Sequence, residues 1–118
     1  MNTLNMKKLN KPNRPMKAAL ALAELSRCRQ KHGAVIVKNG VVLAAGTNAM
    51  REPVSDTNFR SCSVHAEAKV ISQAGSAANG ATIYVGRISR NGEYVDSTPC
   101  KRCQGLMARR GIKKVYHT

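Results

Sequence analysis

Two short runs in the sequence carry residue types that bind a metal and move protons. A His-Ala-Glu run at 65–67 supplies an imidazole and a carboxylate, and a Pro-Cys-Lys-Arg-Cys run at 99–103 supplies two thiols three residues apart. A hydrolytic zinc site uses three protein ligands, usually nitrogen or sulfur atoms, and leaves the fourth position to water. The expected ligands are therefore His65, Cys100 and Cys103.

The second run fits the start of a helix, which we expect over 99–110. Cysteines at i and i+3 lie on one face of a helical turn, so both sulfur atoms can reach one ion. Pro99 suits the first turn, where its missing N–H costs nothing. The positive end of the helix also favours the thiolate form that zinc requires.

The first run fits a helix start as well, in a helix expected over 64–74. Residues two apart do not share a helix face, so His65 and Glu67 can both face the metal only at the helix end. Ser61 or Ser63 is the expected N-cap. Glu67 would then stay off the metal and serve as a general base.

A closed structural zinc site is the alternative. Cys62 lies three residues before His65, so Cys62, His65, Cys100 and Cys103 also read as four ligands of a structural ion. In that case Glu67 is only a helix-surface carboxylate. Both hypotheses predict zinc, but only the catalytic one makes Cys62 dispensable for the metal and Glu67 indispensable for activity.

The H-x-E and P-C-x-x-C motifs together are the signature of zinc nucleobase deaminases. The sequence resembles the cytidine/deoxycytidylate deaminase superfamily, in the branch with a histidine ligand, and most of all small deoxycytidylate-deaminase-like proteins. The resemblance runs from about Ala18 to Tyr116. Besides the zinc motifs it includes the Gly-Ala-Val-Ile-Val run at 33–37 and the Gly-Thr-Asn run at 46–48.

The resemblance implies a fold, a set of site residues and a mechanism. The fold would be α/β, a three-layer α-β-α sandwich with a mixed sheet, lacking the usual extra C-terminal helix. Substrate contacts would come from Asn48, Ala66 and Ala34. Zinc would lower the pKa of a bound water, Glu67 would take its proton, and hydroxide would attack the amino-bearing ring carbon.

The rest of the chain reads as one domain over 16–118, preceded by a basic, flexible N-terminal arm over 1–15. An amphipathic helix is expected first, and Asn39-Gly40 between two apolar runs predicts a β-hairpin. The expected helix spans 16–29, and the expected strands span 34–37, 41–45, 82–85 and 112–116. Strand–helix alternation favours parallel packing of the last two strands. A loop over 49–63 holds Phe59 and Arg60, which could cover the site or stack on a base.

Charge is unevenly distributed along the chain. The net charge is +14, from 20 Lys and Arg against 6 Asp and Glu. Residues 1–38 carry nine basic side chains and one acidic, residues 39–99 carry five of each, and residues 100–118 carry six basic and none acidic. Such a field attracts phosphorylated ligands and polyanions, so nucleic acid is a partner that the basic ends would suit.

Composition limits the remaining possibilities. No run of about 18 apolar residues is present, so we expect no membrane span, and the charged N-terminus lacks the apolar stretch of a signal peptide. Four cysteines with two at a metal do not indicate a disulfide framework, and Cys28 is expected to be a buried free thiol. We therefore expect a cytoplasmic protein. We also expect it to be a homo-oligomer.

The sequence favours a zinc-dependent hydrolytic deaminase that converts a cytosine base to uracil. A free nucleotide such as dCMP or CMP is the expected substrate. Two alternatives remain open: a deaminase of cytosine or adenine within single-stranded DNA or RNA, and a noncatalytic zinc-stabilised module that binds nucleic acid. The single Phe and the absence of Trp argue mildly against a base-stacking surface.

Overall fold

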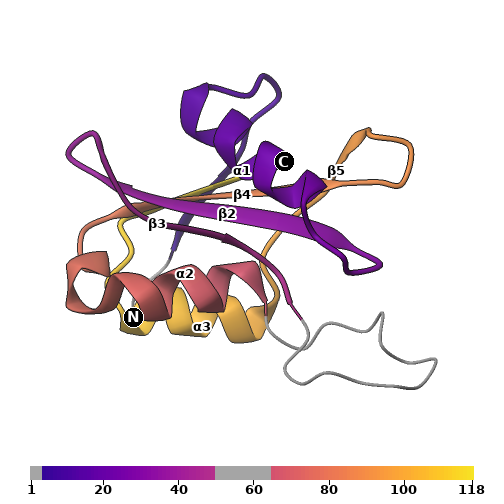
Figure 1. Cartoon of the computed structure of the whole chain (residues 1–118). Helices are drawn as coiled ribbons and strands as arrows, with labels where there is room; N and C mark the ends of the chain where they lie inside the picture. Colours follow the sequence, from indigo (N-terminus) through magenta and orange to yellow (C-terminus); the bar gives the residue numbers. More distant parts are fainter. Residues whose placement is uncertain (1–3, 50–64) are drawn as a thin grey trace, which may run out of the picture.

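The computed structural model describes residues 4–49 and 65–118 (Figure 1). Within these residues, one mixed sheet is combined with three α-helices and one short 3-10 helix. In chain order the elements are β1 (Asn5–Lys8), α1 (Arg14–Glu24), β2 (Lys31–Lys38), β3 (Val41–Thr47), α2 (Ala66–Ala74), η2 (Gly75–Ala78), β4 (Thr82–Ile88), β5 (Tyr94–Val95), α3 (Lys101–Arg109) and β6 (Lys114–His117).

The sheet has the strand order β1-β6-β4-β2-β3, and β5 pairs with β4 outside this path. β2 is antiparallel to both β3 and β4, whereas β6 is parallel to β4 and to β1. Helix α1 covers one face of the sheet, and α2 and α3 cover the other (Figure 1). The predicted three-layer α-β-α sandwich is confirmed, and no helix follows β6 within residues 65–118.

The β2–β3 hairpin forms where the sequence predicts it. Asn39 and Gly40 occupy the turn with positive φ values of 52° and 78°, the backbone conformation that a two-residue hairpin turn requires. The parallel pairing of the last two long strands, β4 and β6, is also confirmed. Both strands are shifted or longer than predicted, since β4 continues to Ile88 and β6 begins at Lys114.

The N-terminal residues do not all form a free arm. Residues 5–8 make β1, which adds to the sheet edge by parallel pairing with β6. Helix α1 begins at Arg14, with the Asn13 side chain accepting a hydrogen bond from the Met16 N–H at 3.1 Å. The basic stretches at the two ends of the sequence therefore meet on neighbouring strands.

Helix α1 packs on the sheet by direct backbone contact. A Cβ atom on Gly33 of β2 would overlap the Ala19 carbonyl oxygen and lie 2.7 Å from the Ala23 nitrogen. Met16, Ala19, Leu20 and Ala23 of the helix are buried there with Val35 and Ile88 of the sheet. A larger core lies on the opposite face, beneath α2 and α3.

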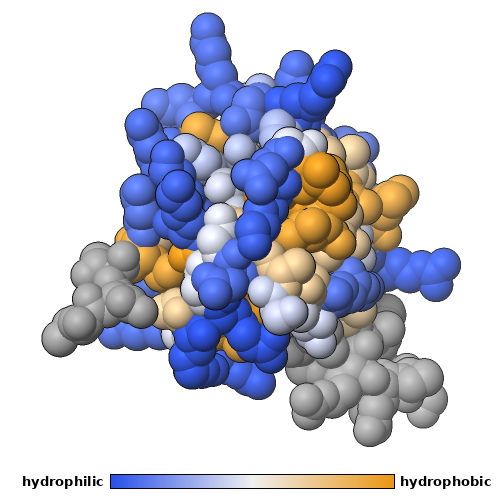
Figure 2. All heavy atoms as spheres, turned by 90° about the vertical axis from the view of Figure 1, so that its left-hand side faces the viewer, coloured by the Kyte–Doolittle hydropathy of each residue, from blue (hydrophilic) through white to orange (hydrophobic). Residues whose placement is uncertain are grey.

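The surface is dominated by polar side chains. Figure 2 shows hydrophilic residues over much of one side of the molecule, interrupted by an apolar patch. Val41 and Val42, at the start of the edge strand β3, are each 58% exposed. Within the described residues no helix is both long and apolar enough to span a membrane.

Candidate active site

The three predicted zinc ligands lie together under one face of the sheet. His65 Nδ1 is 3.8 Å from Cys100 Sγ and 3.3 Å from Cys103 Sγ, and all three ligand atoms lie within 4.8 Å of one another. They come from segments 35 residues apart that the fold brings to one point.

These separations fit a zinc ion. A tetrahedral ion with bond lengths of about 2.0 Å to nitrogen and 2.3 Å to sulfur holds its ligand atoms roughly 3.5–3.8 Å apart. One imidazole and two thiols are also the donor set that zinc prefers. His65, Cys100 and Cys103 would therefore hold the ion, and a zinc ion there would activate a water molecule for attack.

Two helix starts position the ligands. His65 is the N-cap of α2, and Cys100 is the N-cap of α3, with Cys103 three residues later on the first turn. The prediction that a serine caps α2 is therefore wrong, because His65 holds that position. Pro99 lies just before the cap of α3 and not in its first turn. Cys100 and Cys103 therefore both lie at the positive end of the α3 dipole.

Glu67 is a buried acidic residue in the first turn of α2. It follows the N-cap of α2 by two residues and is only 5% exposed. Burial raises the pKa of the Cys103 thiol, and the Glu67 carboxylate and the neighbouring Cys100 raise it further. In the metal-free site the Cys103 thiol therefore keeps its proton, and a bound cation would favour the loss of that proton.

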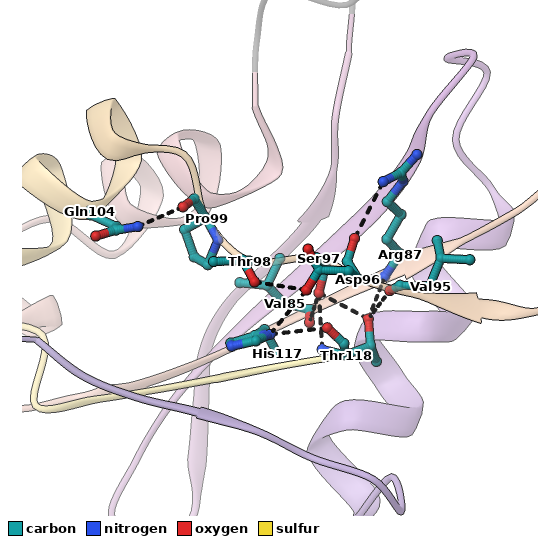
Figure 3. Close-up of polar contacts among 10 residues, drawn as sticks. All are labelled: Val85, Arg87, Val95, Asp96, Ser97, Thr98, Pro99, Gln104, His117 and Thr118. Atoms are coloured by element: carbon teal, nitrogen blue, oxygen red, sulfur yellow. Dashed lines mark hydrogen bonds and ion pairs between the residues drawn. The ribbon is translucent and has the colours of Figure 1, made fainter.

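A polar network holds the segment that leads into the second cluster (Figure 3). The Ser97 hydroxyl donates to the Val85 carbonyl at 2.8 Å, and the Ser97 N–H donates to the Thr118 carbonyl at 2.9 Å. The Thr118 hydroxyl donates to the Val95 carbonyl at 2.8 Å. Gln104 of α3 donates to the Pro99 carbonyl at 2.8 Å. The bonds of Ser97 fix the chain shortly before Cys100 to the middle of β4 and to the residue that follows β6.

The predicted substrate residue Asn48 is buried just after β3 and makes several hydrogen bonds. Its side-chain oxygen accepts from the Ser26 hydroxyl at 2.6 Å and from the His32 N–H at 3.1 Å. Its side-chain nitrogen donates to the Gln30 carbonyl at 2.7 Å, which leaves one N–H. Asn48 therefore organises the segment between α1 and β2, and its contact with substrate stays a prediction.

The two predicted alanines lie on the same side of the sheet as the ligands. Ala34 is fully buried in β2, between β3 and β4, and Ala66 is fully buried at the first position of α2. The Ala66 N–H belongs to the first helical turn, where backbone donors lack intrahelical acceptors. It is therefore the better placed of the two to meet a substrate.

Two residues near the site were missed by the sequence analysis. His32 interacts electrostatically with Glu67 and His65, and Arg87 is its cross-strand neighbour on β4. Both fall in strand residues beyond the predicted strand ends. Extending the predicted alternation by two residues would have placed His32 on the same side as Ala34.

Three other residues with predicted roles, Phe59, Arg60 and Cys62, lie outside the described residues.

The prediction for Cys28 is wrong. Cys28 is disulfide-bonded and is not a free thiol. Cys100 and Cys103 are free.

Comparison with known proteins decides the family. The sequence model described as the cytidine and deoxycytidylate deaminase zinc-binding region matches residues 9–118. The chain belongs to this family. Members and neighbours are zinc-dependent hydrolytic deaminases, and the chain is an enzyme of this type with zinc as its metal. No curated protein sequence matches it significantly.

Solved structures of deaminases share its fold. The dCMP deaminase of cyanophage S-TIM5 in apo form is 28% identical, with a TM-score of 0.66 over 87% of this chain and 78% of that one. The same phage enzyme in complex with dCMP and dUMP is 27% identical, with a TM-score of 0.65 over 86% and 76%. Guanine deaminase from Bacillus subtilis is 25% identical, with a TM-score of 0.62 over 91% and 64%.

Proposed function

We propose that this deaminase hydrolyses the exocyclic amine of the cytosine base of a free nucleotide such as dCMP or CMP, giving the uracil nucleotide and ammonia. The observation that carries the proposal is the His65–Cys100–Cys103 group with the buried Glu67 on the same helix start. The similarity to a phage enzyme crystallised with dCMP and dUMP supports a nucleotide substrate.

Each residue has a defined task in this reaction. Glu67 removes a proton from the attacking water and delivers it to the ring nitrogen, then removes the second proton from the new hydroxyl group on the ring carbon and delivers it to the departing amine. Its burial keeps bulk water from competing for the proton. The Ala66 N–H and the remaining Asn48 N–H would orient the base and sugar. Water supplies the oxygen of the product carbonyl, so atoms and charge balance without another reactant.

A deaminase that acts on polynucleotides is the second candidate, because the fold joins the two basic ends. Asn5 pairs with Lys114 and Lys7 with Tyr116 across β1 and β6. These four residues line a cavity of about 170 Å³. The Tyr116 ring stacks on Tyr84, with centroids 5.2 Å apart. Lysines beside aromatic rings suit a single strand, whose phosphates and bases they can contact.

The noncatalytic zinc module is the third candidate, and zinc content distinguishes it. A closed site needs Cys62 as the fourth ligand, whereas a hydrolytic site leaves that position to water. We expect the Cys62→Ser variant to retain one zinc ion per chain, and the Cys103→Ser variant to lose most of it. Metal analysis of both purified variants checks this. Zinc loss from Cys62→Ser would favour the closed site.

A homo-oligomer remains our expectation for the assembly. In the described part of the chain, β3 has no strand on its outer side, and Val41 and Val42 are exposed there. An edge strand with exposed apolar residues is a common site of pairing between chains. Sedimentation of the zinc-loaded protein checks this directly.

The experiment that tests the function is ammonia release with product mass over a panel of substrates. The panel contains cytidine, deoxycytidine, CMP, dCMP, guanine, and single-stranded DNA and RNA, each run beside the Glu67→Gln variant as the control for contaminants. We expect conversion of one free cytosine nucleotide by the wild type only. Conversion confined to polynucleotide would establish the second candidate. No conversion of any substrate by zinc-loaded protein would refute a cytosine deaminase.

A further inference from the structure

Arg87 and His32 form a polar cross-strand pair on the face of the sheet that carries the zinc ligands. Arg87 of β4 lies directly opposite His32 of β2 in the antiparallel register. Val85 and Ala34, two residues away on the same strands, face the core beneath α2 and α3. Because side chains alternate along a strand, Arg87 and His32 also face that side, where the zinc ligands lie.

The guanidinium of Arg87 has a donor without an acceptor. Its Nη1 donates to the Asp96 carbonyl at 3.3 Å (Figure 3). Its Nε is buried and has no hydrogen-bond partner among the described residues. Buried donors of this kind are rare because each loses its hydrogen bond to water, so an unpaired one calls for an explanation.

The charge of Arg87 is also left without a counterion. Asp96 offers Arg87 its carbonyl, while its carboxylate accepts from the Thr98 hydroxyl at 2.7 Å. Within residues 4–49 and 65–118 no ion pair of Arg87 is present. An anion at this position would supply both the missing acceptor and the missing charge.

His32 connects this pair to the reaction centre. Its N–H donates to Asn48 Oδ1 at 3.1 Å, and its carbonyl accepts from the Asn48 N–H at 3.3 Å. Burial lowers the pKa of its imidazole, Glu67 opposes this shift, and Arg87 and His65 add to it. His32 is therefore within electrostatic range of Glu67 and His65 while lying next to Arg87.

We propose that Arg87 and His32 form a subsite that binds the phosphate group of the nucleotide whose base reacts beside Glu67. This inference rests on the proposed function. A guanidinium fork matches phosphate geometry through two parallel hydrogen bonds, and a neutral imidazole adds a further donor. Because it binds the phosphate, the subsite would make the enzyme prefer nucleotides to nucleosides.

The test compares a nucleotide with its nucleoside. The kcat/KM values for dCMP and deoxycytidine are measured for the wild type, Arg87→Gln and the matched control Arg90→Gln. Arg90 is exposed in the turn between β4 and β5, so its variant removes the same charge from the same hairpin. We expect Arg87→Gln to lower the dCMP value by about 10- to 100-fold. The deoxycytidine value should stay within about twofold.

Other outcomes are equally decisive. An equal loss on dCMP and deoxycytidine overturns the proposal, because Arg87 would then serve the base or the fold. A loss confined to a cytosine-containing oligonucleotide keeps a phosphate at the subsite but assigns it to a polynucleotide. If Arg87→Gln does not fold, Arg87→Lys keeps the charge without the fork and should show a smaller loss of the same selectivity.

Binding of inorganic phosphate separates this proposal from the proposed function. Titration calorimetry on the zinc-loaded wild type should detect phosphate binding that Arg87→Gln weakens and Arg90→Gln does not. This result would support the subsite even if the wild type deaminated nothing in the panel. The subsite would be refuted, and the proposed function kept, by a different result. In that result the wild type converts dCMP but binds no inorganic phosphate, and Arg87→Gln keeps the wild-type preference for dCMP over deoxycytidine.

Discussion

The two faces of the sheet are built in opposite ways. On one face, α1 meets β2 backbone to backbone at Gly33, and the contacts around it are almost entirely apolar. On the other face, the starts of α2 and α3 bring an imidazole, two thiols and a buried carboxylate to one point. The first face can contribute only packing, whereas the second buries polar groups that cost stability unless they are satisfied.

The difference indicates that stability and chemistry can be separated in this protein. Side chains packed against a backbone leave no room for added volume. A substitution that disrupts this packing lowers the free energy of unfolding. A buried acid at a helix start is retained at some cost to folding, which is typical of functional sites. Substitutions on the two faces should therefore move different observables.

The largest expected effect is on turnover, from Glu67→Gln on the chemical face. Losing a general base should lower kcat by about 10²- to 10⁴-fold. The free energy of unfolding should stay within about 1 kcal/mol of the wild type, because a neutral amide of the same shape replaces a buried charge. Ammonia release and urea unfolding measure the two quantities on the same preparations.

Glu93→Gln is the control for this variant. Glu93 is exposed in the turn between β4 and β5, so its variant removes one carboxylate far from the packed core. We expect wild-type turnover and stability from it. Normal turnover in Glu67→Gln would show that Glu67 has a structural role. The assignment of chemistry to this face of the sheet would then be wrong.

The next largest effect is on stability, from Gly33→Ala on the packing face. The new methyl group would overlap the Ala19 carbonyl, which is backbone and can yield only if α1 moves. We expect a loss of about 3 kcal/mol or more in the free energy of unfolding. At a temperature where the variant remains folded, its kcat should stay close to that of the wild type.

Gly46→Ala is the matched control, because its added Cβ would meet only side chains at ordinary contact distances, the flexible Lys69 at 3.4 Å and Val70 at 3.7 Å. Urea unfolding should show a small change for this variant. Equal losses in both variants would mean that the sheet tolerates no alanine at either position. The packing face would then have no special dependence on Gly33.

The features that were predicted correctly depend on local sequence patterns, and those that were missed depend on pairing between distant segments. The zinc ligands and the Asn39-Gly40 hairpin follow from spacing and turn chemistry within a few residues. β1 could not be predicted, because its four mostly exposed residues are held by pairing with β6.

The subsite pair was missed for a similar reason. Neither His32 nor Arg87 belongs to a motif, and only the register of β2 with β4 makes them neighbours. The network of Ser97 and Thr118 likewise joins residues 21 apart. Spacing along a chain can identify ligands that share a helix start, but it does not contain the register of a sheet.

The smallest expected effect is a pH dependence that comes from His32 on the chemical face. Burial lowers the pKa of its imidazole below the ordinary value of 6.5, so the unfolded chain binds the proton more tightly than the folded one. Stability should therefore fall as the pH drops through 6.5, by at most about 1.4 kcal/mol per pH unit from this group. Below the lowered pKa the loss should stop.

Unfolding of the metal-free wild type and His32→Gln between about pH 5 and pH 8 isolates this contribution. A chelator is needed because acid also displaces zinc from His65, which would add a second pH dependence. The difference between wild type and variant should shrink or reverse toward acid pH. In a Glu67→Gln background the His32 pKa should fall further, because the opposing carboxylate is gone, so the window of falling stability should extend to lower pH. A difference that stays constant with pH would mean that folding does not shift the His32 pKa, and an unchanged window in the Glu67→Gln background would mean that His32 does not sense Glu67.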